Sequence, residues 1–308
     1  MFKMKKILVT GGCGFIGSNL VDILIEDGNQ VLVIDDLSSG KKENCNESAK
    51  YIFADIKDVF GDSVREAAHR HVIPKHHTTF LNSVDVIYHL AANARIQPSF
   101  QEPKETIYNN SYGTALICEF ARKINAKIVY AGSSSFYGGI YLNPYAFTKW
   151  QGEEACRMYS EVYGVKTAVA RFFNVYGPRN PLIGQYTPVV AIFEQQLSEG
   201  KDLTIVGDGE QRRDFTHVGD ICRGLIAISK GEYSGDVFNL GTGTNHSINE
   251  LADLFGGNKK YLPPRPGEAR VTLADISKTS EQTGWRPLQR LEEYVSDWLK
   301  NNIHKKGK

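Results

Sequence analysis

The chain has 308 residues, enough to bury a sizeable core in one large domain or two smaller ones. Its 36 basic residues nearly balance its 35 acidic ones, which leaves a formal net charge of +1. This balance argues against a protein that binds nucleic acid mainly through electrostatics, whereas a small anionic ligand needs only local positive groups.

The histidines, the cysteines and the apolar segments argue against a metal-binding, a disulfide-bonded and a membrane-associated protein. The histidines cluster in a polar stretch that we interpret as a solvated helix end and loop, so we expect no metal site at His69, His71, His76 and His77. The cysteines form no C-x-x-C pair, so we expect reduced, buried thiols in a cytoplasmic protein at Cys13, Cys45, Cys118, Cys156 and Cys222. The apolar start ILVTGGCGFIG is too short and glycine-broken for a signal peptide, and we expect no membrane association.

The first half of the chain alternates short β-rich runs with helical patterns. Strands are predicted at 5–10, 30–35, 84–92, 126–135 and 165–177, and helices at 18–28, 109–125 and 145–163. This alternation predicts βαβ units around a parallel sheet. The predicted fold is therefore α/β, a Rossmann-type doubly wound sheet.

The character changes after about residue 175. Segments 177–188 and 261–268 are rich in proline and glycine, whereas 216–231 and 236–241 again read as a helix and a buried strand. We predict one α/β domain at 1–173, to which 217–241 returns. Segments 174–216 and 242–304 would form a smaller mixed α/β lobe, and 305–308 a frayed tail.

The stretch TGGCGFIG lies between the first strand and the first helix. Its glycines, Gly11, Gly14 and Gly17, permit a tight turn and a close approach to a pyrophosphate at the helix N-terminus. Alone, such a triplet is often only a tight turn. Here Asp35 ends the next strand, where a carboxylate binds adenosine ribose hydroxyls and repels a 2′-phosphate. With Asp36 beside it, the pattern predicts NAD rather than NADP.

A second notable stretch, GSSSFYGGIYLNPYAFTK, covers residues 132–149. Tyr145 and Lys149 are four positions apart and would share one helical face. By itself the stretch equally describes a polar turn that leads into an amphipathic helix with an incidental tyrosine and lysine.

Several motifs occur in order along nearly the whole chain: GGCGFIG, FADIKD, HLAA, NNSYGT, YAFTK, RFFNVYGPR, GDGEQRRDFTHVGD and RPGEARVTLADISK. Together they resemble the nucleotide-sugar epimerases and dehydratases, which are extended short-chain dehydrogenases/reductases. The resemblance implies that Tyr145 is the general base, that Lys149 stabilises its phenolate and holds the cofactor ribose, and that Ser133 hydrogen-bonds the reacting oxygen.

The resemblance also assigns binding residues, each of which could instead be structural, Asn110 above all. NAD would be contacted by Gly11, Gly14, Phe15, Ile16, Gly17, Asp35, Asp36, Ser39, Gly40, Asp55, Ile56, Leu90, Ala91, Ala92, Asn110, Tyr145, Lys149 and Phe172. The nucleotide sugar would be contacted by Ser134, Asn174, Val189, Leu203, Val206, Arg213, Arg265, Glu268 and Thr272. Glu268 stands where the family usually has aspartate, and Arg212 is interpreted as a surface residue.

The residues after Ser133 favour one reaction of the family. Dehydratases carry an acidic pair there, whereas this chain has Ser134 and Ser135, which favours inversion at C4 of a UDP-sugar. Thr272 stands where a bulky tyrosine would exclude N-acetyl groups, so UDP-GlcNAc/UDP-GalNAc is the first expectation and UDP-Glc/UDP-Gal the second. Pro181 replaces an arginine typical of uronic-acid epimerases. The residues predicted beside the base do not distinguish uracil from thymine.

Three further points follow from the resemblance. Only seven residues separate Tyr137 from Tyr145, where the family usually has a loop about twice as long, so the sugar pocket would be reshaped. Helices at 112–125 and 145–163 would pair in a homodimer through a four-helix bundle. A dehydratase, a reductase that exchanges its cofactor, and a non-catalytic NAD-binding protein remain alternatives.

Overall fold

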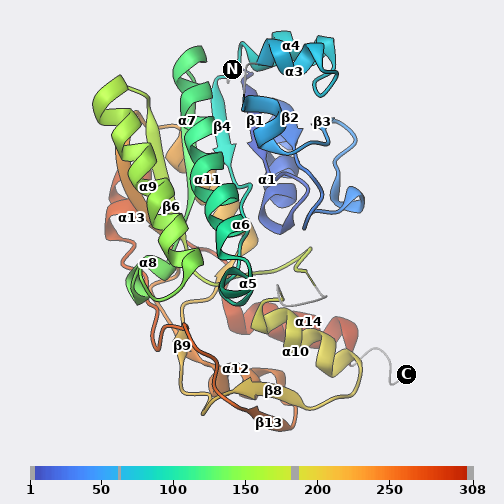
Figure 1. The fold of residues 1–308 in the computed structure, drawn as a ribbon. Coiled ribbons are helices and arrows are strands. Elements are labelled where there is room, and N and C mark those ends of the chain that lie inside the picture. The colour runs from blue at the N-terminus through green and yellow to red at the C-terminus, as the bar shows by residue number, and fades with distance from the viewer. Residues whose placement is uncertain (1–3, 62–63, 182–186, 304–308) are drawn as a thin grey trace.

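The computed structural model describes residues 4–61, 64–181 and 187–303 and contains a central sheet with helices on both faces (Figure 1). All seven strands are parallel, in the order β11-β6-β5-β4-β1-β2-β3. The strands are β1 Lys6–Thr10, β2 Gln30–Ile34, β3 Lys50–Ile52, β4 Val86–His89, β5 Lys127–Ser133, β6 Thr167–Phe172 and β11 Ser234–Leu240. The predicted doubly wound Rossmann-type sheet is confirmed.

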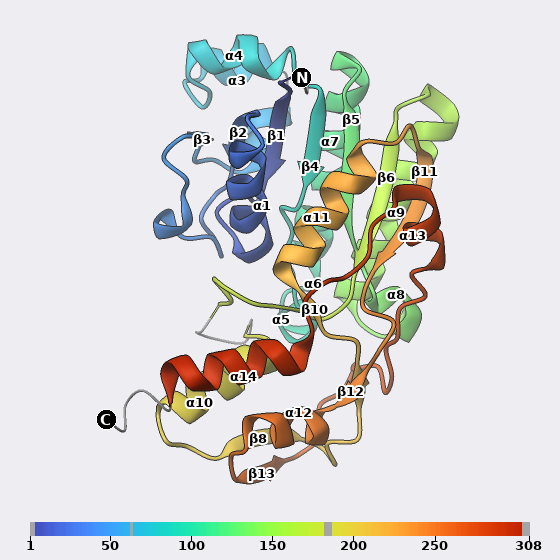
Figure 2. The same cartoon turned by 180° about the vertical axis from the view of Figure 1, so that it is seen from behind.

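Helices cover both faces because the central strands are apolar on both sides. One face is covered by α2 Ile56–Phe60, α3 Val64–His69, α4 Lys75–Leu81, α7 Gly113–Ile124 and α9 Pro144–Tyr163. On the opposite face, seen in Figure 2, lie α1 Phe15–Glu26, α11 Val218–Ser229 and α13 Ser277–Thr283. A buried apolar cluster fills each side of the sheet.

The smaller lobe lies beyond the carboxyl ends of the strands (Figure 1). It contains α10 Val189–Ser198, α12 Ile248–Phe255, α14 Leu291–Asn302, β8 Leu203–Val206, β9 Arg212–Arg213, β12 His246–Ser247 and β13 Lys259–Leu262. These strands pair as β8 with β13 and β9 with β12, while β7 Val175–Tyr176 pairs with β10 Thr216–His217. A separate apolar cluster from Tyr176 to Leu299 forms the core of this lobe.

The remaining elements are short and follow sheet strands. They are η1 Lys42–Asn44, α5 Ile96–Gln101, α6 Pro103–Ile107, the π-helical turn η2 Tyr108–Tyr112 and α8 Ser135–Gly138. α5 and α8 lie at the end of the sheet that faces the smaller lobe (Figure 1). The carboxyl edge of the sheet is thus surrounded by elements from both halves of the chain.

Two expectations about exposure were wrong. His77 is buried in α4, as are Phe80 and Leu81 of the same helix, so only part of the histidine stretch is solvated. Cys45 is only half-buried because it follows the short surface turn η1. All five cysteines are free thiols. The predicted tail at 305–308 lies outside the described residues. Within them, no helix is long and apolar enough to cross a membrane.

The glycine-rich turn has no room for a side chain at two of its glycines. Gly11 has φ +73°, and a Cβ added to it would lie 2.8 Å from the Ala91 backbone nitrogen. A Cβ on Gly17 would lie 2.1 Å from the Gly11 carbonyl oxygen. On Gly14 the nearest heavy atom would be 3.3 Å away. Two glycines therefore bring β1, α1 and the end of β4 into contact.

We predict that Gly17→Ala lowers the free energy of unfolding by about 1–3 kcal/mol, because the backbone must shift to admit the methyl group. Urea unfolding followed by circular dichroism measures the change. Gly14→Ala in the same turn is the matched control and should lose clearly less. Equal losses in the two variants would show that the clash at Gly17 does not determine the stability of the turn.

Candidate active site

The start of α9 is defined by its first residues. The Asn143 side-chain oxygen accepts a hydrogen bond from the Ala146 N–H at 2.7 Å, and Pro144 takes the first helical position, where no N–H is needed. Ser99 of α5 accepts a bond from the Tyr145 N–H at 3.1 Å. Tyr145 therefore lies in the first turn, with Lys149 one turn later on the same face.

Tyr145 lies beside the end of β5, which carries Ser133. Burial raises the pKa of the Tyr145 phenol, while a hydrogen bond from Ser133 and then the charge of Arg95 lower it. In the sheet, Ser133 pairs with Phe172 of β6, which itself pairs with Leu240 of β11. The structure thus brings together the three predicted catalytic residues and Phe172, which the resemblance to the family assigns to the nicotinamide side of the NAD site. Arg95 had no role in the sequence-based prediction.

Lys149 is buried against an aromatic ring. Its Nζ lies 4.3 Å from the centroid of Tyr130, which belongs to β5. Gly152 makes this possible because a Cβ there would lie 2.2 Å from the Tyr130 hydroxyl. Burial lowers the pKa of Lys149 to about 8, and the charge of Glu153 opposes that shift. Lys149 consequently keeps its proton at neutral pH, although it has little contact with water.

A buried ion pair lies directly behind Lys149. Arg171 of β6 donates from Nη2 to Glu153 at 2.6 Å and from Nε to both carboxylate oxygens at 3.1 Å. The guanidinium also stacks 3.5 Å from the centroid of Phe136 in α8. This pair fixes α8 against α9 and places a carboxylate near Lys149. No local pattern marks this pair: Arg171 is a lone charge in the apolar strand β6, and Glu153 is one of several charges on α9.

A chain of buried polar groups connects the sheet edge with α9. The neutral His89 ring, whose pKa burial lowers to about 3, bonds the Thr10 hydroxyl at 2.7 Å and the Thr114 hydroxyl at 3.2 Å. Asn110, in the π-helical turn, bonds both backbone groups of Asn93 and donates to Thr148 at 3.0 Å. Asn110 therefore ties the loop after β4 to the catalytic helix, which is a structural role.

The glycine-rich turn fits a dinucleotide. α1 begins at Phe15 after the N-cap residue Gly14, with no side-chain cap and no acidic residue in its first turn, so its N-terminal N–H groups suit an anion. The Asp35 carboxylate accepts bonds from the Cys13 N–H at 2.9 Å and the Leu37 N–H at 2.8 Å. Its remaining lone pairs can accept ribose hydroxyls. A Cβ on Gly40 would lie 2.8 Å from Asp35, so this glycine leaves room beside the carboxylate.

Other residues predicted to contact the cofactor lie on the same sheet edge. Asp55 caps α2 by accepting the Lys57 N–H at 2.8 Å and pairs with the Lys57 ammonium, while Ile56 is buried. The Ala91 N–H donates to Thr10 at 3.2 Å. Asp36 bonds Ser38. Contact of any of these residues with NAD stays a prediction.

The predicted nucleotide-sugar residues form two pairs from distant parts of the chain. Asn174 donates to the Thr272 hydroxyl at 3.1 Å, and Arg213 lies 3.5 Å from Glu268. Arg265 is exposed. Ser134 is buried after β5, and Val189 and Val206 are half-buried.

Two residues have surroundings that the sequence did not reveal. The Leu203 side chain is fully buried in the core of the smaller lobe, so its predicted place beside the base has no exposed side chain to support it. Arg212, interpreted as a surface residue, is partly exposed; it bonds Asn245 and pairs with the exposed Glu250 at 2.9 Å, a contact that the sequence-based prediction did not include.

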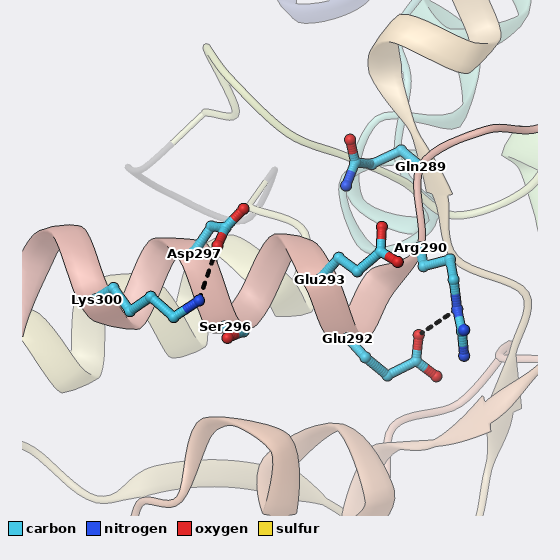
Figure 3. A pocket seen from close by; sticks show the side chains of 7 residues that line it. All are labelled: Gln289, Arg290, Glu292, Glu293, Ser296, Asp297 and Lys300. Carbon is cyan, nitrogen blue, oxygen red and sulfur yellow. Dashed lines mark hydrogen bonds and ion pairs between the residues drawn. The ribbon is translucent and has the colours of Figure 1, made fainter.

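A shallow depression elsewhere lies along α14 and includes Gln289, Arg290, Glu292, Glu293, Ser296, Asp297 and Lys300 (Figure 3). Its charges pair with one another, Lys300 with Asp297 at 3.3 Å and Arg290 with Glu292 at 3.6 Å. Among the described residues, no cluster of three or more His, Cys, Asp or Glu could hold a metal ion.

The chain is similar to characterised sugar-nucleotide enzymes. A UDP-glucose 4-epimerase of Mycolicibacterium smegmatis is 32% identical over 94% of this chain and 96% of the relative. The solved UDP-glucose 4-epimerase of Thermotoga maritima, with UDP-glucose, is 33% identical over 96% and 99% of the two chains (TM-score 0.85). The UDP-N-acetylglucosamine 4-epimerase of Methanobrevibacter ruminantium M1, in complex with UDP-N-acetylmuramic acid, is 32% identical over 99% and 100% (TM-score 0.85).

A family model also matches residues 7–241, from β1 through β11. This span contains the glycine-rich turn, the Tyr145/Lys149 helix and the strands that position them. The chain is therefore an NAD-dependent enzyme of the NAD dependent epimerase/dehydratase family.

Proposed function

We propose that this enzyme inverts C4 of a UDP-hexose or UDP-N-acetylhexosamine through a transient 4-keto sugar. The observation that carries the proposal is the grouping of Ser133, Tyr145 and Lys149 at the carboxyl edge of the sheet, next to a glycine-rich turn that fits a dinucleotide. The names of similar proteins support the UDP-sugar class.

The protein's part in the reaction is proton transfer and positioning. Bound NAD supplies the acceptor and later the donor of the C4 hydride. The Tyr145 phenolate takes the proton of the C4 hydroxyl as the C–H bond breaks and returns it after the ketone has turned over in the site. Ser133 donates a hydrogen bond to the reacting oxygen, and the Lys149 ammonium stabilises the phenolate.

The turn after β5 favours epimerisation over dehydration. Elimination of water from a 4-keto sugar needs a group that protonates the leaving hydroxyl. Here the neighbouring side chains are Ser134 and Ser135, and the oxygen atoms of the Ser133 and Ser135 hydroxyls lie 3.1 Å apart. A serine hydroxyl is a poor acid at neutral pH, so the ketone would be reduced rather than dehydrated.

The preferred sugar follows from Thr272. Its small side chain is buried and accepts a hydrogen bond from Asn174, a proposed diphosphate contact. A small residue leaves room for an N-acetyl group, which favours UDP-GlcNAc/UDP-GalNAc, with UDP-Glc/UDP-Gal second. Arg213, Arg265 and Glu268 would bind the diphosphate and ribose.

We predict that Tyr145→Phe reduces kcat at least a hundredfold while NAD remains bound, because only the phenolic oxygen is removed. Turnover of a UDP-sugar and the NAD content of the purified protein measure the two effects. Phe172→Leu, which alters the nicotinamide side, is the comparison and should weaken NAD binding instead. A Tyr145→Phe variant that kept a tenth of wild-type kcat would refute the assignment of the base.

The substrate class is tested by incubating purified protein with UDP- and dTDP-sugars, without added NAD, and following C4 inversion by proton NMR. We expect inversion of UDP-sugars, with N-acetylated ones preferred. Loss of the C6 hydroxyl would instead restore the dehydratase alternative, and a requirement for added NAD(H) with net conversion would restore the reductase.

Thr272→Tyr should reduce kcat/KM for the N-acetylated substrate about tenfold more than for the plain hexose, since the ring would fill the N-acetyl space. Thr272→Ser keeps the hydroxyl bonded to Asn174 and is the matched control. Equal loss on both substrates would show that Thr272 does not select the N-acetyl group.

We also propose a homodimer, because α7 and α9 lie side by side (Figure 1) and large apolar side chains are exposed on α9 and on the segment just before α7. The exposed set is Ile107, Tyr108, Tyr112, Met158, Val162 and Tyr163. Pairing this face with its copy would form a four-helix bundle. The expected location in the cytoplasm likewise stays a prediction.

Light scattering at micromolar concentration should give twice the chain mass of 34.4 kDa. Val162→Glu should shift the protein towards monomer, since Val162 is 63% exposed and its replacement need not disturb the fold. Leu288→Glu changes a leucine that is 72% exposed and lies outside α7 and α9, so it should leave the dimer intact. A monomeric wild-type protein would contradict the proposal.

A further inference from the structure

Residues 264–270 of the smaller lobe, here called the nucleotide arm, carry the proposed UDP contacts Arg265 and Glu268. The arm does not stand alone in solvent. It packs against three parts of the sheet domain that surround Tyr145: α5, α8 and the residue that begins α9. The relative position of substrate-binding and catalytic groups is thus set by a short contact surface.

Two hydrogen bonds hold the arm in place. Gln97 of α5 donates from Nε2 to the Pro266 carbonyl at 3.1 Å. Asn143 donates from Nδ2 to the Gly267 carbonyl at 3.0 Å. Both acceptors are backbone groups, so the arm's position is fixed independently of its side chains.

Close steric contacts also hold the arm against the sheet domain. Gly267 has φ +78°, and a Cβ there would lie 2.8 Å from the Phe100 ring. A Cβ on Gly138 of α8 would lie 2.8 Å from Ala269 Cβ. Because each contact requires a glycine, the arm and the sheet domain approach one another as closely as their backbones allow.

The short loop between α8 and α9 has a contact with the arm at each end. Gly138, beside Ala269, precedes the loop, and Asn143, bonded to Gly267, follows it. Within the loop, Tyr141 is 81% exposed and Leu142 is 42% exposed. The segment that is short relative to the family thus joins the two places where the arm meets the sheet domain.

Asn143 contacts the arm and is also the N-cap residue of α9, the helix that carries Tyr145 and Lys149. It is 5% exposed, and its two amide atoms serve different partners: Oδ1 accepts from the Ala146 N–H, and Nδ2 donates to Gly267. A serine at this position could cap the helix equally well but could not reach both partners with separate atoms.

We propose that Asn143 is a positioning residue that couples the seating of the nucleotide arm to the first turn of α9, and so places the bound nucleotide relative to Tyr145. The inference rests on the proposed function, because it takes Arg265 and Glu268 as nucleotide contacts. Asn143 itself need not touch the substrate. Its amide donor acts on substrate binding through the arm, and its amide oxygen acts on the helix.

The test separates these two actions by substitution. Asn143→Ser retains a capping oxygen and loses the donor, so we expect KM for the preferred UDP-sugar to rise about fivefold or more, with kcat within about twofold of wild type. The melting temperature should stay within about 2 °C. Asn143→Ala removes the cap as well and should lower the melting temperature and kcat together.

Gly267→Ala disturbs the same contact between the arm and the sheet domain, but from the arm's side and without altering α9. The added methyl group clashes with Phe100 and strains the backbone, so KM should rise as in Asn143→Ser. Amide hydrogen exchange of residues 264–270 should become faster in both variants. Unchanged KM and unchanged exchange in Asn143→Ser would overturn the proposal, and so would a loss of stability equal to that of Asn143→Ala.

Hydrogen exchange also distinguishes this proposal from the proposed function. If wild-type protein turned over no UDP-sugar, the function would be wrong, while faster exchange of the arm in Asn143→Ser would still establish the coupling. If wild-type protein were active and the arm exchanged equally fast in both proteins, the coupling alone would be wrong.

Discussion

The site depends on a lysine ammonium buried one helical turn beyond a tyrosine. A free phenol has a pKa near 10 and is a poor base at neutral pH, so a positive charge must be held close to it. Lys149 lies over the Tyr130 ring, with its proton retained partly through the negative charge of Glu153. Burial strengthens the interaction between the ammonium and any phenolate formed at Tyr145 because little water screens it.

Much of the surrounding structure keeps that charge arrangement in place. The Glu153–Arg171 pair prevents an uncompensated carboxylate in the core and joins α9 to β6. The network through His89, Thr114 and Asn110 connects the same helix with the strand ends that would face the cofactor. Tyr145, the proposed base, and the strand ends that would face the cofactor are therefore held at the same edge of the sheet, and the smaller lobe contacts that edge through residues 264–270.

Features that short-range sequence patterns encode could be predicted, whereas features that depend on tertiary contacts could not. The βαβ alternation and the Gly11–Gly17 turn follow from local rules of sterics and periodicity, so the sheet and the dinucleotide site could be predicted. The Glu153–Arg171 pair joins a helix to a strand 18 residues away, and its partners are ordinary charges until the fold brings them together. The π-helical turn at Asn110 has no distinctive local signal either. His77 was misjudged because a polar neighbourhood in sequence does not reveal which helix face is covered.

In the proposed reaction, the C4 hydrogen leaves and returns as a hydride that never reaches solvent. The most direct measurement uses the preferred UDP-sugar labelled with deuterium at C4, in ordinary water and without added NAD. We expect the epimerised product to retain deuterium at C4, as seen by mass spectrometry and by the missing C4 proton signal. Product that carries hydrogen at C4 would show exchange with solvent and would contradict transient oxidation within a closed site.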